Sequence, residues 1–586
     1  MTMIDAPRQD SWPVTGFVPA DFDGADLSQV EPLAKELLTR DVTDRDAFDR
    51  WLEDRSELDA ACSESAANLY IAMTCHTEDE AKQGAYGAYV ENVAPKLKQL
   101  AFELDKQQDR LARMHAEGDA RLAVLTRDTS AEVELFREEN IPVQTELEKL
   151  SQTYDQVIGR MTVEFDGEER TLPQMGRYLE EDDRSVREHA WRATAERRLQ
   201  DRETIDGLFD EMIAKRQKLA ENAGEKDFVG YAFRMRRRFD YGPAECARFH
   251  DAVSEKIVPF LRRLDASRKE QLGVDALRPW DLSVDPKGRS PLRPFANGAD
   301  LVAKSRRVFD RLDPELAEMF RELGEGDKAQ GAEGGACLDL DSRKGKAPGG
   351  YQYNRDRSRV PFIFMNAAGL HRDVETMVHE AGHAFHSMLC RPEPLVHYRE
   401  SPIEFAEVAS MTMELLTMPY WGEYYDDPAD ADRARRKQIE GSVSILPWIA
   451  TIDAYQHWLY TNATHTREER TAAWLGLDER FGHAVDWSGV EATRESQWQR
   501  QGHLFGAPFY YIEYGIAQLG ALGLWIKALE DGPDSALEAY KRALSLGGSR
   551  PLPELFNAAG LPFDFGPERV GALLERVESE LAKLPE

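Results

Sequence analysis

The sequence has few cysteines, and their spacing is not that of a disulfide framework or a metal-binding pair. The chain of 586 residues contains five: Cys62, Cys75, Cys246, Cys337 and Cys390. Their number is odd, their positions are scattered, and no CxxC pair occurs. This pattern predicts free thiols in a reducing compartment, the cytoplasm, and gives no indication of a thiolate zinc site.

The sequence also lacks a long apolar run. The longest uncharged apolar stretch near the C-terminus, Tyr514 to Ile526, is bounded by Glu513 and Lys527. It is too short to cross about 30 Å of hydrocarbon as a helix. The first residues, MTMIDAPRQDSWPV, contain no basic segment followed by an apolar one. We therefore expect neither a membrane span nor a secretion signal.

Positive charge is scarce as well. Lys and Arg number 74 against 106 Asp and Glu, which gives a formal net charge of −32. Because phosphate backbones and anionic lipids bind through Lys and Arg, we expect neither nucleic acid nor a membrane as a partner. The charge favours a well-solvated surface, and the alternative is a negative cleft that attracts cationic ligands.

The remaining composition supports a large folded body. Hydrophobic residues make up 42% and charged residues 31% of the chain, and its length is several times that of a typical domain of about 100–150 residues. Helical periodicity over residues 93–114 and 133–161 indicates packed helices more than coiled coils. We predict a mainly α fold, with an N-terminal helical lobe over 1–200 and a second region over 201–586.

Signals for strands are few and lie in two places. Residues 161–172 alternate around Asp166-Gly167, which suits a hairpin with a type I′ turn. Short apolar runs at 337–342 and 359–366 predict strands, and the Gly-, Pro- and Lys-rich segment between them predicts a turn region. Residues 324–335 are predicted to form a loop. The small sheet thus lies just before the principal motif.

That motif is His-Glu-Ala-Gly-His at residues 379–383. On a helix, positions i and i+4 share one face, so His379 and His383 can reach one metal ion and Glu380 can reach a water on it. Apolar spacing over 373–390, with Pro392 beyond it, predicts the helix. The alternative is a polar helix face with two hydrogen-bonded histidines.

A hydrolytic zinc site needs a third protein ligand. Residues 402–418 predict a second helix, with Ser401 as its N-cap and Glu404 as the capping-box partner. Glu407, one turn further, stands among apolar neighbours, where a carboxylate needs a partner such as a metal. Spacing favours Glu407 over Glu404 as the third ligand.

Three further residues are expected to support the ligands from behind through hydrogen bonds. They are Glu404, Glu414 on the second helix, and His386, which lies seven residues after His379 on the same face. Ordinary packing is the alternative for each of them.

An aromatic segment at residues 503–525 is the other notable cluster. Within twelve residues it carries His503, Phe505, Phe509, Tyr510, Tyr511 and Tyr514. A packed core segment is the usual fate of such residues. The functional alternative is that His503 and one or two tyrosines donate hydrogen bonds to an oxyanion beside the metal.

Taken together, these motifs resemble the oligoendopeptidase F and thimet oligopeptidase family of zinc peptidases, and most closely its oligoendopeptidase F-like branch. The resemblance rests on HEAGHAFH at 379–386, the EFAE that begins at Glu404, the HLFGAPFYYIEYGIAQ that begins at His503, and the segment 339–350 with the PFIFMN after it. It covers the chain from about Met161 to the C-terminus.

The resemblance implies a two-lobed, almost wholly helical, gluzincin-like fold with a small β-sheet beside the active site and a deep central channel. One Zn²⁺ per chain would be held by His379, His383 and Glu407, with Glu380 as the general base. The channel would admit short peptides and exclude folded proteins.

The resemblance also implies which residues line the substrate side, namely His503 and the tyrosines. In thimet-type members the spacing from His to Tyr differs by about one residue, so Tyr514 is favoured as the oxyanion donor. The second tyrosine is Tyr510 or Tyr511, and both stay open.

Backbone around Gly349, Gly350 and Tyr351 is expected to present a strand edge to which a peptide adds by main-chain hydrogen bonds. We therefore predict a cytoplasmic zinc metallo-oligoendopeptidase. The alternatives are a zinc carboxypeptidase or dipeptidyl carboxypeptidase, and a catalytically idle peptide-binding protein. The intact Glu380 disfavours the last, because binding alone requires no base.

Overall fold

The computed structural model describes residues 14–324 and 337–585. Over these residues the fold is mainly helical, with one two-stranded and one three-stranded sheet, and the predicted fold class is confirmed. The loop predicted at 324–335 lies, apart from its first residue, outside the described residues. Within the described part of the chain, no helix is both long enough and apolar enough to cross a lipid bilayer.

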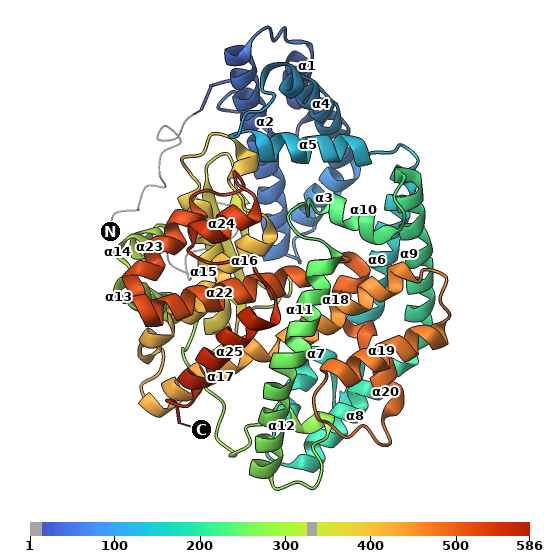
Figure 1. Ribbon diagram of the computed structural model, residues 1–586, viewed down its shortest axis with the longest axis vertical. Helices are drawn as coiled ribbons and strands as arrows, with labels where there is room; N and C mark the ends of the chain where they lie inside the picture. The colour runs from blue at the N-terminus through green and yellow to red at the C-terminus, as the bar shows by residue number, and fades with distance from the viewer. Residues whose placement is uncertain (1–13, 325–336, 586) are drawn as a thin grey trace.

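The N-terminal helices build a hydrophobic cluster of their own at one end of the body (Figure 1). Its buried side chains come from residues 18–125, with Leu395 and Tyr398 added from far along the chain. A larger cluster runs from Leu135 to Leu581. The division predicted at residue 200 stays a prediction. The helices are α1 (Leu27–Thr39), α2 (Arg45–Cys75), α3 (Glu80–Ala88), α4 (Ala94–His115) and α5 (Ala123–Leu135).

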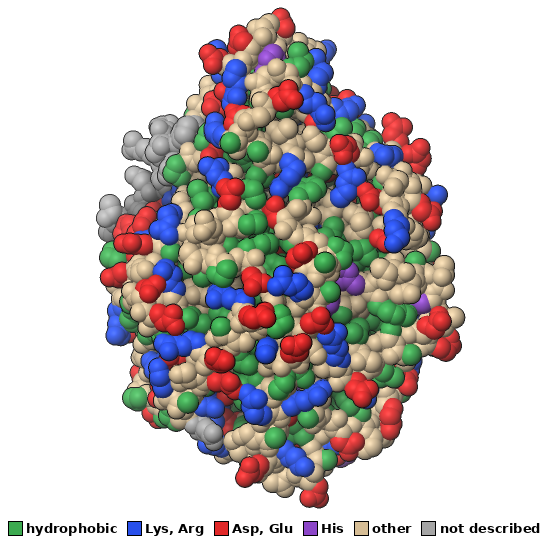
Figure 2. Space-filling model, in the orientation of Figure 1, with side chains coloured by type: hydrophobic (Ala, Val, Ile, Leu, Met, Phe, Trp, Pro, Cys, Tyr) green, Lys and Arg blue, Asp and Glu red, His purple; other side chains and the backbone are tan. Residues whose placement is uncertain are grey.

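Several aspartates of this acidic chain act as helix N-caps. An aspartate at the N-cap accepts hydrogen bonds from first-turn amides, and its charge faces the positive end of the helix dipole. The aspartates in this position are Asp26, Asp44, Asp79, Asp183, Asp227, Asp313 and Asp427. On the face shown in Figure 2, acidic side chains are interspersed with Lys and Arg. The negative charge there is spread over the surface.

The central part of the chain contains the hairpin that the alternating pattern predicted. Strands β1 (Thr162–Phe165) and β2 (Glu168–Thr171) pair antiparallel. Asp166 and Gly167 between them have φ of 54° and 75°, as a type I′ turn requires. The helices of this part are α6 (Asn140–Gly159), α7 (Leu172–Met175), α8 (Arg184–Gln200), α9 (Arg202–Ala223), α10 (Phe228–Met235), α11 (Pro243–Ala252), α12 (Val258–Leu272), α13 (Gly298–Leu312) and α14 (Pro314–Glu322).

The three-stranded sheet has the order β3-β5-β4. Strand β3 (Leu338–Asp341) runs parallel to β5 (Val360–Ala367), and β4 (Tyr351–Arg355) runs antiparallel to it. The prediction of a turn over the whole intervening segment is wrong for β4, because this polar run takes its extended form by pairing with β5. Among the described residues β4 pairs on one side only, which leaves its other edge without a strand partner.

The C-terminal helices enclose the candidate site. Helix α16 (Ile403–Leu416) packs against both α15 (His371–Leu389) and α22 (Ile512–Asp531), and all three cross the middle of the body (Figure 1). The others are α17 (Pro428–Ser444), α18 (Leu446–Thr461), α19 (Arg467–Phe481), α20 (Glu491–Glu495), α21 (Gly502–Gly506), α23 (Pro533–Leu544), α24 (Leu552–Ala558) and α25 (Pro567–Leu581).

Candidate active site

Helix α15 presents two imidazoles on one face. His379 and His383 lie one turn apart, and their ring centroids are 4.9 Å apart with an interplanar angle of 79°. Both side chains keep partial exposure, 23% and 18%, in a helix whose residues are mostly buried. The spacing in the sequence therefore places both rings where they can share one ligand.

Gly382 lets α16 approach α15 closely. A Cβ atom at this position would lie 2.6 Å from the carbonyl oxygen of Ala409 and 2.6 Å from Cα of Ser410, both on α16. No side chain fits into this contact between two helix backbones. The glycine within the motif thus brings the next helix up to the two histidines.

Glu407 supplies a carboxylate to the same point from α16. Its Oε2 lies 3.5 Å from Nε2 of His379 and 3.7 Å from Nε2 of His383, and the three residues each offer a ligand atom within 4.8 Å of the others. Tetrahedral zinc binds nitrogen and carboxylate oxygen at about 2.0–2.2 Å, which places neighbouring ligand atoms about 3.3–3.6 Å apart. Both the donor set and its spacing fit zinc.

The electrostatics of the cluster favour a cation. Burial opposes protonation of His379, but the carboxylates of Glu414, Glu407 and Glu380 outweigh it and raise the pKa of His379 to about 10. Burial and the nearby His379 lower the pKa of His383 well below its usual value. The positive charge of a bound metal ion would balance the negative charge of these carboxylates, and both imidazole rings would then be neutral.

Glu414 and Gln438 stand behind the first histidine. Oε1 of Glu414 lies 2.7 Å from Nδ1 of His379, and its Oε2 accepts a hydrogen bond of 2.7 Å from Nε2 of Gln438. The pair fixes the ring so that its Nε2 faces Glu407. Sequence reasoning missed Gln438, which lies on α17 and belongs to no motif.

Glu380 lies next to the first histidine and is only 7% exposed. Burial raises the pKa of its carboxyl to about 7; the charge of His379 opposes the shift and that of Glu407 adds to it. The nearby backbone amide of Gln352 in β4 also opposes the rise in this pKa. A carboxyl with a pKa near 7 can take up and release a proton near neutral pH.

Glu404 has a different place from the one predicted. Helix α16 begins after Pro402 without a side-chain cap, and Oε1 of Glu404 accepts a 2.7 Å hydrogen bond from Tyr241 and lies 3.6 Å from Nε of Arg238. The predicted capping box of Ser401 and Glu404 is therefore wrong, because tertiary partners take both side chains. These bonds also point Glu404 to Tyr241 and Arg238 instead of the candidate ligands.

His386 also bonds away from the candidate ligands. Its Nε2 lies 3.0 Å from Oγ of Ser401, which donates a 3.0 Å hydrogen bond to the carbonyl oxygen of Gly547. Since that hydroxyl proton is used on Gly547, the hydroxyl accepts from His386. The structure thus uses His386 to tie α15 to the start of α16, in place of the expected support behind a ligand.

The aromatic segment forms one cluster. The ring of His503 lies 5.0 to 6.1 Å, between centroids, from the rings of Tyr510, Tyr511 and Tyr514. Nε2 of Gln501 lies 2.7 Å from Nδ1 of His503 and holds that ring. Gln501 stands two residues before His503, and the sequence offered no signal for this contact.

The three tyrosines have different surroundings. The rings of Tyr510 and Tyr514 lie 5.3 Å apart between centroids, and burial first, with the charge of Glu407 adding to it, raises the pKa of both hydroxyls. Burial raises the pKa of Tyr511, and its neighbours Trp448 and Gln501, which are hydrogen-bonded to each other at 3.0 Å, oppose the shift. The charge of the candidate ligand Glu407 thus acts on Tyr510 and Tyr514, while the ring of Tyr511 lies 5.5 Å from that of Tyr514.

The segment before and within β4 offers backbone to the site. Gly349 has φ of 102°, and a Cβ on Gly350 would lie 3.4 Å from the carbonyl oxygen of Phe364. Tyr351 stacks on Phe364 with centroids 4.8 Å apart, and its hydroxyl lies 2.6 Å from Oγ1 of Thr74 on α2. Its side chain is thus occupied by α2, and its main chain is what remains for a ligand.

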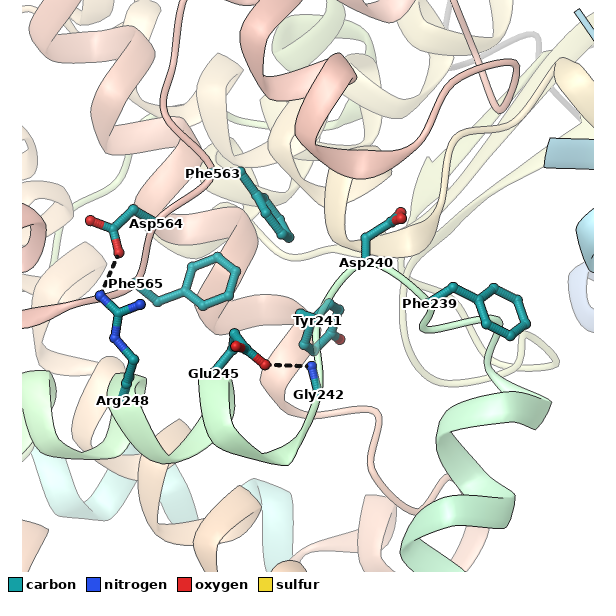
Figure 3. Close-up of a pocket in the computed structure, with 9 residues that line it drawn as sticks. All are labelled: Phe239, Asp240, Tyr241, Gly242, Glu245, Arg248, Phe563, Asp564 and Phe565. Atoms are coloured by element: carbon teal, nitrogen blue, oxygen red, sulfur yellow. Dashed lines mark hydrogen bonds and ion pairs between the residues drawn. The ribbon is translucent and has the colours of Figure 1, made fainter. Parts of the chain in front are cut away.

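A separate pocket of about 610 Å³ opens where α11 begins. Figure 3 shows Tyr241, Phe563 and Phe565 around it, and Arg248 on α11 paired with Asp564 at its side. None of the candidate metal or aromatic residues is among those that line it. The pocket and the metal cluster are therefore two distinct features.

Comparison with known proteins points to one family. The sequence profile of peptidase family M3 matches residues 177–565, a span that contains every candidate metal residue and the aromatic cluster. Oligopeptidase PepF of Bacillus subtilis is 25% identical over 336 residues, which cover 56% of this chain and 48% of PepF. The chain spans about half the length of the curated relatives it matches.

The likeness of the folds extends over nearly the whole chain. The structure of Pz peptidase A with inhibitor 2 has a TM-score of 0.85 and 26% sequence identity, and covers 97% of this chain and 99% of that one. A protein described as an oligoendopeptidase F has a TM-score of 0.84 and 28% identity, with the same coverage.

Proposed function

Because the chain belongs to peptidase family M3, within its oligoendopeptidase F group, we propose that it is a zinc-dependent endopeptidase that hydrolyses short peptides. The observation that carries this proposal is the convergence of His379, His383 and Glu407 on one point, with Glu380 beside them. That arrangement combines a metal-binding set with a carboxyl that can exchange a proton.

His379, His383 and Glu407 would hold one zinc ion per chain. When bound, zinc supplies a Lewis acid that lowers the pKa of a water and polarises a peptide carbonyl. Glu414 would keep Nδ1 of His379 protonated and its Nε2 turned to the ion.

Glu380 would act as the general base. It takes a proton from the water that attacks the carbonyl carbon and passes it to the amine nitrogen as the C–N bond breaks. Its pKa of about 7 suits both halves of this transfer near neutral pH. Burial, the main cause of that pKa, is a property of the folded site.

Tyr514, Tyr510 and His503 would stabilise the negative charge that develops on the carbonyl oxygen. Hydrogen-bond donors already aimed at such a charge lower the barrier because they need no rearrangement. The raised pKa of both tyrosines keeps their hydroxyls protonated and able to donate. The position of these two residues relative to Glu407 supports Tyr510 over Tyr511 as the partner of Tyr514.

The substrate would lie along the free edge of β4. The backbone of Gly349, Gly350 and Tyr351 would add a peptide by main-chain hydrogen bonds, next to the Gln352 amide that influences the pKa of Glu380. Recognition through the main chain would make the enzyme tolerant of side chains. A channel that admits short peptides and excludes folded proteins completes the proposal.

The test is mass-spectrometric profiling of a peptide library in which half of the peptides are amidated at the C-terminus. We expect internal cleavage of amidated and free peptides alike, loss of cleavage with a chelator, and recovery with zinc. Glu380→Gln protein, purified identically, controls for a contaminating peptidase. Cleavage restricted to free C-termini would instead indicate a carboxypeptidase, and bound zinc without any cleavage a peptide-binding protein.

A further inference from the structure

A second cluster of metal-binding side chains lies outside the site described above. Cys246 on α11 and Asp453 and His457 on α18 each offer a ligand atom, and the three atoms lie within 4.8 Å of one another. The two helices pack against each other and run side by side near the centre of Figure 1. The cluster thus joins two helices that are far apart in the sequence.

Each helix contributes a pair at the spacing of one turn. Cys246 and His250 are four residues apart on α11, and Asp453 and His457 are four apart on α18. This is the spacing by which His379 and His383 reach one point. All four side chains are therefore on facing sides of the two helices, and Nε2 of His250 lies 2.8 Å from Oδ2 of Asp453.

Two of the polar atoms in this cluster are left without a partner. Asp453 is completely buried, and while its Oδ2 accepts from His250, its Oδ1 has no hydrogen-bond partner among the described residues. Nε2 of His457 lies 3.4 Å from Oδ2 of Asp453, yet it too lacks a hydrogen-bond partner in that part of the chain. Buried polar atoms without partners are costly and call for an explanation.

We propose that Cys246, Asp453 and His457 bind a second divalent transition-metal ion, with zinc as the best match, and that His250 positions the carboxylate. Thiolate, imidazole and carboxylate are the donors that zinc prefers. A thiolate and a carboxylate together neutralise a dication, so the filled site carries no net charge into the interior. By holding Oδ2, His250 leaves Oδ1 free for the ion.

The place of this cluster indicates a structural role. Cys246 and Asp453 are 1% and 0% exposed and His457 keeps 16%, which leaves no room for a peptide, so the free energy of binding an ion there would add to the stability of the fold. The ring of His457 contacts Phe509 with centroids 5.2 Å apart, and Phe509 directly precedes Tyr510. An ion here would brace α11 and α18 together with the loop that carries Tyr510, just before α22.

The rival interpretation is a metal-free chain of hydrogen bonds, His250 to Asp453 to His457, in which a protonated ring balances the carboxylate. That arrangement needs no thiolate, so Cys246 would take no part in it. The two interpretations therefore differ in whether the Cys246 sulfur touches a metal.

Cobalt(II) alone is a direct probe of that contact, because cobalt bound to a thiolate gives a near-ultraviolet charge-transfer band. The proposed His379–His383–Glu407 site contains no sulfur, so of the two proposed sites only the second can produce the band. In protein stripped with a chelator and titrated with cobalt, we expect the band in wild type, in Glu407→Ala and in the control Cys62→Ser, and its loss in Cys246→Ser. Absence of the band in wild type, or its persistence in Cys246→Ser, overturns the proposal.

Zinc content gives a second readout that does not depend on activity. After loading with zinc and desalting, we expect two ions per chain in wild type and one in His457→Gln or in Glu407→Ala, with folding checked by circular dichroism. His250→Gln should keep the cobalt band and weaken cobalt affinity by about 10–100-fold. A folded His457→Gln protein that retains both ions excludes the site, whereas loss of zinc in Glu407→Ala alone bears on the proposed catalytic site.

Discussion

Nδ1 of His379 donates a 2.7 Å hydrogen bond to Oε1 of Glu414, and Nε2 of the same ring faces Oε2 of Glu407 at 3.5 Å. Glu414 thus fixes the orientation of the His379 ring, and Glu407 faces the ring nitrogen that would bind the metal. Because the proton is fixed on Nδ1, Nε2 keeps the lone pair that a metal needs. The proposed metal site is therefore shaped by a residue that does not belong to the metal-binding motif.

The first prediction concerns this support. Glu414→Gln should lower zinc affinity by about 10–100-fold, because a neutral amide holds the His379 ring less firmly and the negative charge beside that ring is lost. Competition with a chromogenic chelator measures the change. Glu423→Gln, which removes a carboxylate from a surface pair with Arg307 and Arg311, is the matched control. Equal zinc affinities in the two variants would show that Glu414 does not support zinc binding by His379.

The second prediction separates the two candidate third ligands. Glu407→Ala should lose the zinc ion at the proposed catalytic site, seen in elemental analysis as one ion fewer per chain, because two imidazoles alone hold it weakly. Glu404→Gln should keep zinc, while its unfolding free energy falls by about 1–3 kcal/mol, since Tyr241 and Arg238 lose a buried charged partner. The reverse pattern of zinc contents would make Glu404 the ligand.

The third prediction concerns the proposed base. Glu380→Gln should retain zinc, and its kcat/KM should fall by about 10²–10⁴-fold, because the amide cannot take up the proton of the attacking water. Glu375→Gln on the same helix, where the carboxylate pairs with His371, serves as the control and should retain turnover. A Glu380→Gln enzyme with normal turnover would refute the assignment.

The fourth prediction tests the contact at Gly382. Gly382→Ala should force α15 and α16 apart, with a loss of about 1–3 kcal/mol in the free energy of unfolding, and should weaken zinc binding because Glu407 moves away. Urea denaturation and zinc competition measure the two effects. Gly441→Ala in α17, where nothing lies within 4 Å of the added Cβ, should be neutral or stabilising.

The fifth prediction ranks the tyrosines. Tyr514→Phe should reduce kcat by about 10²–10³-fold with zinc retained, because a donor to the developing oxyanion is lost. Tyr510→Phe should follow in the same direction, and Tyr511→Phe should have the smallest effect, since Trp448 and Gln501 adjoin Tyr511 and the charge of Glu407 acts on the other two tyrosines. Steady-state kinetics on one fluorogenic peptide compares the three. A larger loss in Tyr511→Phe would reverse the assignment.

The local sequence was sufficient to predict the two helices that carry the candidate metal ligands. Apolar spacing and flanking prolines predicted them at 373–390 and 402–418, and the structure has α15 at His371–Leu389 and α16 at Ile403–Leu416. Their approach at Gly382 then follows from a residue that is also in the motif. These features depend on neighbours in sequence, so periodicity and spacing reveal them.

Other features depend on contacts between distant segments. Ser401 bonds with His386 and Gly547 in place of capping its own helix, and Gln438 reaches Glu414 from the following helix. Tyr510 and Tyr511 are adjacent in sequence, but packing turns them toward different partners. No local pattern encodes these choices, because each is decided by what the rest of the chain brings alongside.

The arrangement of α15 and α16 has a consequence for how the protein assembles. All three proposed zinc ligands lie on this single helix–loop–helix segment, whereas the tyrosines arrive with α22, much later in the chain. Closing a short loop costs less entropy than closing a long one, and metal binding favours the conformation that creates the site. Zinc capture can therefore precede completion of the catalytic groups. A chain whose folding stopped before α22 docked would contain all three proposed ligands and still lack Tyr514 at the site.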